Sequence, residues 1–134
     1  MKKLLYLPIL MALAACTNVP SNITDDKVFF AFDSADITDA ARKDLHAQSL
    51  YMKMNRNVDV ILEGHCDERG STEYNLALGA LRAGNAAHVL MKDGIEPRRI
   101  RTISFGKGKP QYPGTGEAVW AKNRNVTTKT KTRK

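Results

Sequence analysis

Between residues 63 and 82 the sequence places a carboxylate and a guanidinium on two consecutive elements. The run Glu63-Gly64-His65-Cys66-Asp67-Glu68-Arg69-Gly70 follows an apolar stretch, and Asn75, Leu78 and Arg82 come after it along a helical pattern. This pattern puts a fixed anion, Asp67, and a fixed cation, Arg82, on two elements of one small domain. Asp67 and Arg82 are therefore candidate binding residues. The alternative is an internal ion pair, which contributes only about 0–1 kcal/mol when exposed.

The same run contains four reactive residue types, His65, Cys66, Asp67 and Glu68. Neighbours in an extended strand point to opposite faces, so these four do not form one cluster unless the loop bends sharply. Separated ligand pairs typical of a zinc site are absent from this run. We therefore predict no catalytic residue, no metal site and no cofactor. Cys66 is expected to be an inert, small buried residue, the alternative being an exposed thiol.

The elements that would carry these residues can be read from periodicity. Val28–Phe32 is an apolar run typical of a buried strand, and Thr38 can cap a helix that ends near Asn55. One face of that helix would carry Ala41, Leu45, Gln48 and Met52. The alternation around Val58, Val60 and Leu62 predicts a second strand, which delivers Gly64 to the charged loop.

The second half of the chain predicts a matching set of elements. Ser71 or Thr72 can cap a helix that stops at Gly94 and carries a stripe of Leu76, Ala80, Ala83, Ala87 and Leu90. A third strand at 100–105, a short helix at 117–123 and a last strand from 124 to about 130 complete the order β-α-β-α-β-α-β. This order implies an α/β sandwich with a mixed parallel and antiparallel sheet.

The N-terminus reads as a targeting segment rather than as part of the fold. Lys2 and Lys3 precede an apolar stretch, and the small residues before Cys16 suit a cleavage site, so residues 1–15 are predicted to be a signal peptide. Polar residues 16–26, interrupted by Pro20, suit a tether. Cleavage lowers the formal charge of +7 by two, and the remaining excess is C-terminal. We interpret residues 131–134 as a solvated basic tail, not a nucleic-acid contact.

Several separate motifs resemble the OmpA-like domain family in the right order. They span roughly residues 28–126 and are Phe32-Asp33 with Asp36-Ile37, Glu63 to Asp67, Asn75 to Gly79, Arg82-Ala83, Ser104-Phe105-Gly106 with Pro110, and Asn123-Arg124. Within that family, Asp67-Glu68-Arg69-Gly70 and Leu78-Gly79 look like the peptidoglycan-associated lipoproteins. The resemblance implies a two-layer α/β domain over residues 27–130 that binds and does not react.

The resemblance also implies a ligand, the meso-diaminopimelate of peptidoglycan stem peptides. By this resemblance Asp67 would bind its ammonium and Arg82 its carboxylate, Asn75 would support the site, and Arg124 would lie at the rim. The connecting loop would add backbone N–H donors and consists of Phe32, Asp33, Ser34, Ala35, Asp36 and Ile37. Departures are Asn125 where relatives often have a second arginine, Gly84 where they often have Asn, and a threonine- and lysine-rich end that suggests a frayed edge strand.

Location and partners follow from the same resemblance. Leu13-Ala14-Ala15-Cys16 resembles a lipobox, so Cys16 would be acylated and would anchor the chain in outer-membrane lipid, with the domain in the periplasm. Expected partners are peptidoglycan and a TolB-like propeller protein of the Tol-Pal system, which supports envelope integrity and division. The alternative is an OmpA-like wall-binding lipoprotein outside the Tol system.

Overall fold

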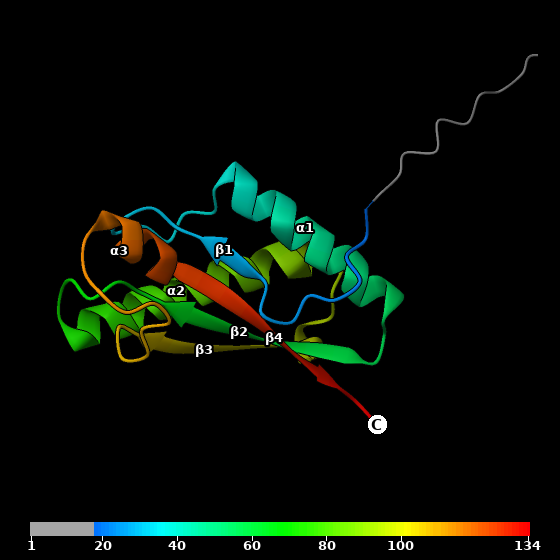
Figure 1. The fold of residues 1–134 in the computed structure, drawn as a ribbon. Coiled ribbons are helices and arrows are strands. Elements are labelled where there is room, and N and C mark those ends of the chain that lie inside the picture. The colour runs from blue at the N-terminus through cyan, green and yellow to red at the C-terminus, as the bar shows by residue number, and fades with distance from the viewer. Residues whose placement is uncertain (1–17) are drawn as a thin grey trace, which may run out of the picture.

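A four-stranded sheet with two long helices on one face makes up the body of the protein (Figure 1). The computed structural model describes residues 18–134, so the predicted signal peptide and the predicted acylation site Cys16 lie outside the described residues. The elements in chain order are β1 (Lys27–Phe29), α1 (Asp39–Met54), β2 (Val58–His65), α2 (Thr72–Lys92), the 3-10 helix η1 (Pro97–Arg99), β3 (Ile100–Gly106), α3 (Glu117–Asn123) and β4 (Asn125–Thr132). The predicted α/β sandwich with a mixed sheet is confirmed.

The last strand lies inside the sheet, in the order β1-β4-β2-β3. β4 pairs antiparallel with both β1 and β2, whereas β2 and β3 are parallel. The expectation of a frayed edge strand was therefore wrong, and β4 continues to Thr132. Its polar residues can be buried because they are hydrogen-bonded: the Thr128 hydroxyl donates to Gln48 Oε1 at 2.6 Å and the Thr127 hydroxyl to Asn125 Oδ1 at 2.7 Å.

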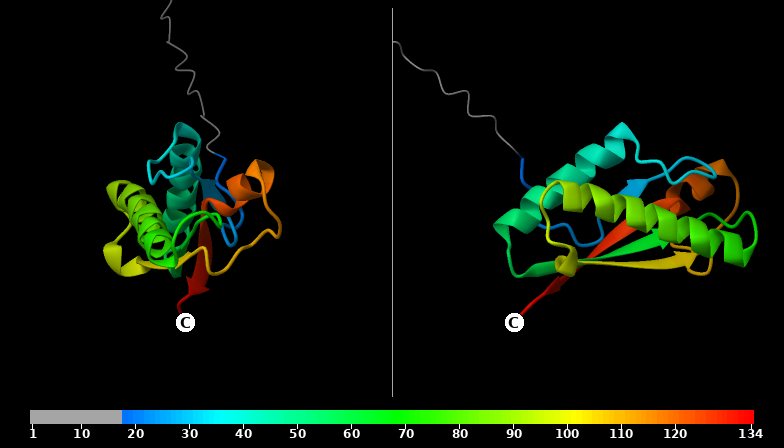
Figure 2. Two further views of the ribbon diagram at one scale, coloured as in Figure 1. Left: turned by 90° about the vertical axis from the view of Figure 1, so that its left-hand side faces the viewer. Right: turned by 180° about the vertical axis from the view of Figure 1, so that it is seen from behind.

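Both long helices begin at the side-chain caps that the sequence predicts. The Ala41 N–H donates to Thr38 Oγ1 and the Tyr74 N–H to Ser71 Oγ, each at 3.1 Å. In α1 the buried face is the predicted one, including Leu45. Figure 2 shows α1 and α2 on the same side of the sheet, with α3 at one end of it.

The inward face of α2 differs from the predicted stripe in its first half. Leu76 and Ala80 are exposed, while Asn75, Leu78 and Arg82 are buried. The first half of α2 packs over the end of β2 and the loop that follows it. Backbone carbonyls there accept hydrogen bonds from the buried Asn75 and Arg82 side chains. Only the second half faces the apolar core, so the predicted Ala83, Ala87 and Leu90 are confirmed there.

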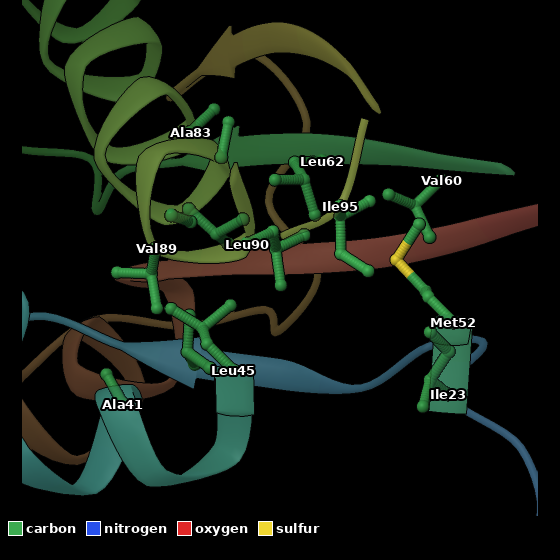
Figure 3. Packing of buried hydrophobic residues seen from close by; sticks show 14 of the residues in the cluster. Ile23, Ala41, Leu45, Met52, Val60, Leu62, Ala83, Val89, Leu90 and Ile95 are labelled. Carbon is green, nitrogen blue, oxygen red and sulfur yellow. The ribbon is translucent and has the colours of Figure 1, made fainter. Parts of the chain in front are cut away.

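The core fills the space between the helices and the sheet (Figure 3). Leu45 from α1, Leu62 from β2 and Leu90 from α2 are all fully buried. The predicted strand Val28–Phe32 is shorter than expected: β1 ends at Phe29, and only Val28 and Phe30 face inward in that run. Phe32 lies in the following loop and is exposed, because the pairing with β4 ends at Phe29.

Residues before β1 pack against the domain, contrary to the expected free tether. Ile23 has no exposed surface and belongs to the core. The Asp25 N–H donates to Thr128 O and the Thr128 N–H to Asp26 O, both at 2.8 Å. Residues 18–134 thus contain every described strand and helix and the whole core cluster. Within them, no helix has the length and hydropathy needed to cross a bilayer.

Candidate ligand-binding site

A hollow of about 380 Å³ lies where the end of β2, the start of α2 and the β1–α1 loop meet. Its position on β2 follows from the break in pairing after Gly64, where the register with β3 shifts and the chain turns into the charged loop. The lining residues are Phe32, Asp33, Cys66, Asp67, Arg69, Gly70, Tyr74, Asn75, Leu78 and Arg82. Asp67 and Arg82, predicted to act together, therefore line one hollow.

Asp67 is a buried carboxylate whose partners are two arginines. Its Oδ1 accepts from the Arg69 N–H at 3.0 Å, and its Oδ2 accepts from Arg69 Nη2 at 2.8 Å and lies 3.5 Å from Arg124 Nη1. Burial acts to raise the pKa of Asp67, but the bonds to Arg69 and Arg124 outweigh it and hold the pKa below the ordinary 3.8. Asp67 is therefore a fixed anion at neutral pH.

Arg82 is almost completely buried and is hydrogen-bonded to backbone carbonyls. Its Nε donates to Ser34 O at 2.7 Å, Nη1 to His65 O at 3.1 Å and Nη2 to Ala31 O at 3.0 Å. These bonds fasten the β1–α1 loop to the end of β2. A guanidinium has five N–H donors, so two remain beyond these three bonds. Burial lowers the pKa of Arg82.

The internal ion pair between Asp67 and Arg82, the alternative reading of these two residues, is not formed among residues 18–134. The ion pairs of Asp67 there are with Arg69 and Arg124. The two charges face the same hollow as separate groups, which is the arrangement that a ligand with both charges requires.

Arg69 is a charged lining residue that the sequence analysis did not assign to the site. Its guanidinium lies 3.9 Å from the ring centroid of Phe32 and 4.1 Å from that of Trp120, so it is stacked between them while it binds Asp67. Trp120 belongs to α3, and its Nε1 donates to Glu68 Oε1 at 2.9 Å. No local signal could have shown this contact, because α3 is far away in the sequence.

The predicted loop lies beside the hollow, but only Phe32 and Asp33 line it. Two of its N–H groups are already bonded within the loop, Ser34 to Ala31 O and Asp36 to Ser34 Oγ. The loop mainly offers carbonyls: Ser34 O accepts from Arg82, and Ala35 O accepts from Asn85 Nδ2 at 2.8 Å. Ile37 packs against the core.

The other two predicted residues occupy distinct positions. Asn75 lines the hollow and its Nδ2 donates to Arg69 O at 2.8 Å and Ser71 O at 3.0 Å, which fixes the charged loop. Arg124 stands behind Asp67, donates from Nε to Phe30 O at 2.9 Å and pairs with Glu117 at 2.8 Å. Arg124 does not line the hollow.

Cys66 and His65, the potentially reactive residues at the start of the loop, are both buried and packed against neighbouring groups. Cys66 is buried and its thiol lies 3.3 Å from Asn75 O, and burial raises its pKa. His65 is buried with its ring tilted on Phe105, and burial lowers its pKa. Within residues 18–134 no three His, Cys, Asp or Glu side chains are grouped closely enough to hold a metal ion.

Comparison with known families identifies the domain. The model of the OmpA family matches residues 29–124. The chain belongs to the OmpA family. Over 103 residues it is 41% identical to the peptidoglycan-associated lipoprotein of Rhizobium meliloti, covering 77% of this chain and 58% of the relative. It is 39% identical over 103 residues to that of Mesorhizobium japonicum, covering 77% and 61%. The OmpA-family chain thus spans about 60% of the length of these curated relatives.

One solved structure supports the same membership, and a second shares the fold. The peptidoglycan-associated lipoprotein of Burkholderia pseudomallei matches with a TM-score of 0.76 and 35% identity, over 78% of this chain and 89% of that one. The C-terminal domain of Helicobacter pylori MotB matches with a TM-score of 0.74 at 21% identity, over 80% and 84%. The second likeness shows that this OmpA-family fold is shared, and nothing about the ligand.

Proposed function

We propose that this chain is a non-catalytic lipoprotein that binds peptidoglycan stem peptides at meso-diaminopimelate. The observation that carries the proposal is the presence of a buried carboxylate, Asp67, and a buried guanidinium, Arg82, on the wall of one hollow. The names of the relatives, peptidoglycan-associated lipoproteins, support it.

The ligand would bind by replacing an internal cation. The Asp67 carboxylate already receives three bonds from Arg69, and Arg69 is about one-third exposed, whereas Arg124 is almost buried. The ligand ammonium would therefore displace the Arg69 guanidinium, and the ligand carboxylate would accept from the two remaining N–H groups of Arg82. Each charge-assisted hydrogen bond contributes about 1.5–3 kcal/mol.

The proposal is tested by pull-down with purified peptidoglycan. We expect Asp67→Asn and Arg82→Lys each to reduce retention at least about tenfold, since removing one partner of a buried interfacial pair costs about 2–5 kcal/mol. Lysine keeps the charge at position 82 but cannot hold the carbonyls and a carboxylate together. Walls that contain lysine in place of diaminopimelate should retain the wild type poorly, because they lack the extra carboxylate.

Matched substitutions at exposed positions provide the controls. Asp39→Asn and Arg42→Lys change the same chemical groups on the outer surface of α1 and should leave retention intact. Thermal unfolding separates loss of binding from loss of fold, which matters for Arg82 because it fastens the loop. Unchanged retention of folded Asp67→Asn and Arg82→Lys proteins would refute the assignment.

The cellular setting belongs to the same proposal. An acylated Cys16 would anchor the chain in the outer membrane, with the domain in the periplasm. The hollow lined by Asp67 and Arg82, which we call the wall site, would then join the membrane to the cell wall. In the Tol-Pal system, which supports envelope integrity and constriction at division, a TolB-like propeller protein would compete for an overlapping surface. Simultaneous saturating binding of stem peptide and propeller protein would contradict that overlap. Absence of any binding to the propeller protein would favour the alternative, a wall-binding lipoprotein outside the Tol system.

A further inference from the structure

A second hollow, of about 160 Å³, lies at the opposite end of the sheet from the wall site. It forms where β2 begins, η1 passes into β3 and β4 ends. Its charged lining residues are Asp59, Arg98, Arg99, Arg101, Lys131 and Arg133. Five cations around one carboxylate make this hollow, which we call the basic end, a strongly positive concave site.

Strand register places two of these cations, Arg101 and Lys131, on the face of the sheet that lacks the long helices. Lys131 stands opposite Asp59 across the β4–β2 ladder, and Arg101 stands beside Ile61 across the β2–β3 ladder. Val58, Val60 and Leu62 alternate with these positions and are buried on the helix side. Lys131 and Arg101 therefore lie on the face of the sheet opposite the core, which carries no long helix (Figure 2).

The internal anions neutralise only part of this charge. Asp59 lies 3.2 Å from Arg133 Nε and 3.8 Å from Arg99 Nε, and Glu96 pairs with Arg98. Within residues 18–134, neither Arg101 nor Lys131 takes part in an ion pair, and both are exposed.

The buried Arg99 fixes the backbone around the basic end through hydrogen bonds to carbonyls. Arg99 donates to Met52 O at 2.9 Å and Asn55 O at 3.0 Å, which ties the start of β3 to the end of α1. The exposed cations on either side of it therefore project from rigid elements. A rigid, concave group of cations with a net positive charge matches the charge of a phosphate group.

We propose that the basic end docks on the phosphate groups of a membrane surface. The described N-terminal segment and the C-terminus lie on the same half of the molecule, away from α3 and the wall site (Figures 1 and 2). The source of the phosphate rests on the proposed anchor at Cys16. Because Ile23 is fixed in the core, only residues 16–22 could separate that anchor from the domain, at most about 25 Å when extended. A membrane would then lie within reach of the basic end, and contact there would turn the wall site toward the cell wall.

Co-sedimentation with lipid vesicles tests the proposal on protein that lacks the lipid anchor. Residues 18–134, which contain every described element and the core, are mixed with phosphatidylcholine vesicles that either lack or contain phosphatidylglycerol. We expect binding only to the anionic vesicles and weaker binding at high salt. The double variant Arg101→Gln, Lys131→Gln should bind about 25-fold more weakly, since each basic residue near an anionic surface contributes roughly fivefold.

A second pair of substitutions separates the site from net charge. Arg42→Gln, Lys43→Gln removes the same charge from the exposed surface of α1 and should retain the wild-type affinity. Equal losses in both double variants, or equal sedimentation with both kinds of vesicle, would overturn the proposal. Inorganic phosphate is titrated separately, and tight binding of it without vesicle binding would overturn the membrane assignment in favour of a free anion. Retention of the Arg101→Gln, Lys131→Gln variant by peptidoglycan keeps this outcome distinct from failure of the wall site.

Discussion

At the scale of single residues, two of the three buried arginines hold loops in place, which composition does not reveal. Arg82 holds the β1–α1 loop at the wall site, and Arg99 holds the end of α1 at the basic end, each through backbone carbonyls. Arg82 both holds the loop and is proposed to contact the ligand. A loss of binding in an Arg82 variant therefore has to be separated from a change in the loop.

The lowered pKa of Asp67 predicts that its contribution to the free energy of unfolding depends on pH. Its pKa in the folded protein is below the ordinary value of 3.8, so the ionised carboxylate stabilises the fold above that value. This stabilisation is lost as the pH falls through the lower folded-state pKa. We expect the difference in free energy of unfolding between wild type and Asp67→Asn to be largest near neutral pH and to shrink below pH 3.8, measured by urea unfolding. A difference that does not vary with pH would contradict the pKa argument.

At the scale of elements, the close contact between β2 and α2 depends on two glycines. A Cβ on Gly64 would lie 1.9 Å from Gly79 O, and a Cβ on Gly79 would lie 2.3 Å from Ser104 Oγ. The helix can approach the strand this closely only without side chains at both positions. Arg82 lies about one turn after Gly79 in α2. The close contact therefore sets the distance between Arg82 and the end of β2.

A second glycine in α2 has no such reason in the packing. A Cβ on Gly84 would meet nothing within 4 Å, and the residue is exposed. We expect Gly84→Ala to raise the free energy of unfolding by about 0.5–1 kcal/mol, because alanine is the better helix former and restricts the unfolded chain. Gly79→Ala in the same helix should destabilise instead, since the added methyl meets Ser104 and the β2 backbone. Urea unfolding of both variants measures the contrast, and destabilisation by Gly84→Ala would refute it.

At the scale of the whole molecule, the segment before β1 belongs to the fold. Ile23 is completely buried in the core, and residues around it bond to β4. We expect Ile23→Ala to lower the free energy of unfolding by about 2–5 kcal/mol through lost burial and a cavity. Ser21→Ala, at an exposed neighbour, should change it by less than about 0.5 kcal/mol. Denaturant unfolding compares them, and similar values for the two variants would mean that the segment is a free tether.

The sequence by itself determined the order of elements, the helix caps and the buried face of α1, and it singled out Asp67 and Arg82 as candidates, whose place on one hollow came from the fold. These follow from local periodicity, from side chains that cap their own helix, and from motifs contiguous along the chain. Asn75 was predicted as a supporting residue, and its bonds to the charged loop agree with that position.

Only the tertiary structure decided which distant groups meet. The central place of β4, the stacking of Arg69 between Phe32 and Trp120, and the burial of Ile23 each join segments far apart along the chain. Their sequences give no sign of this, because a polar strand can be buried once its hydroxyls find acceptors, and a short polar segment can dock through one apolar side chain. Such contacts depend on the partner surface, which exists only after the chain has folded.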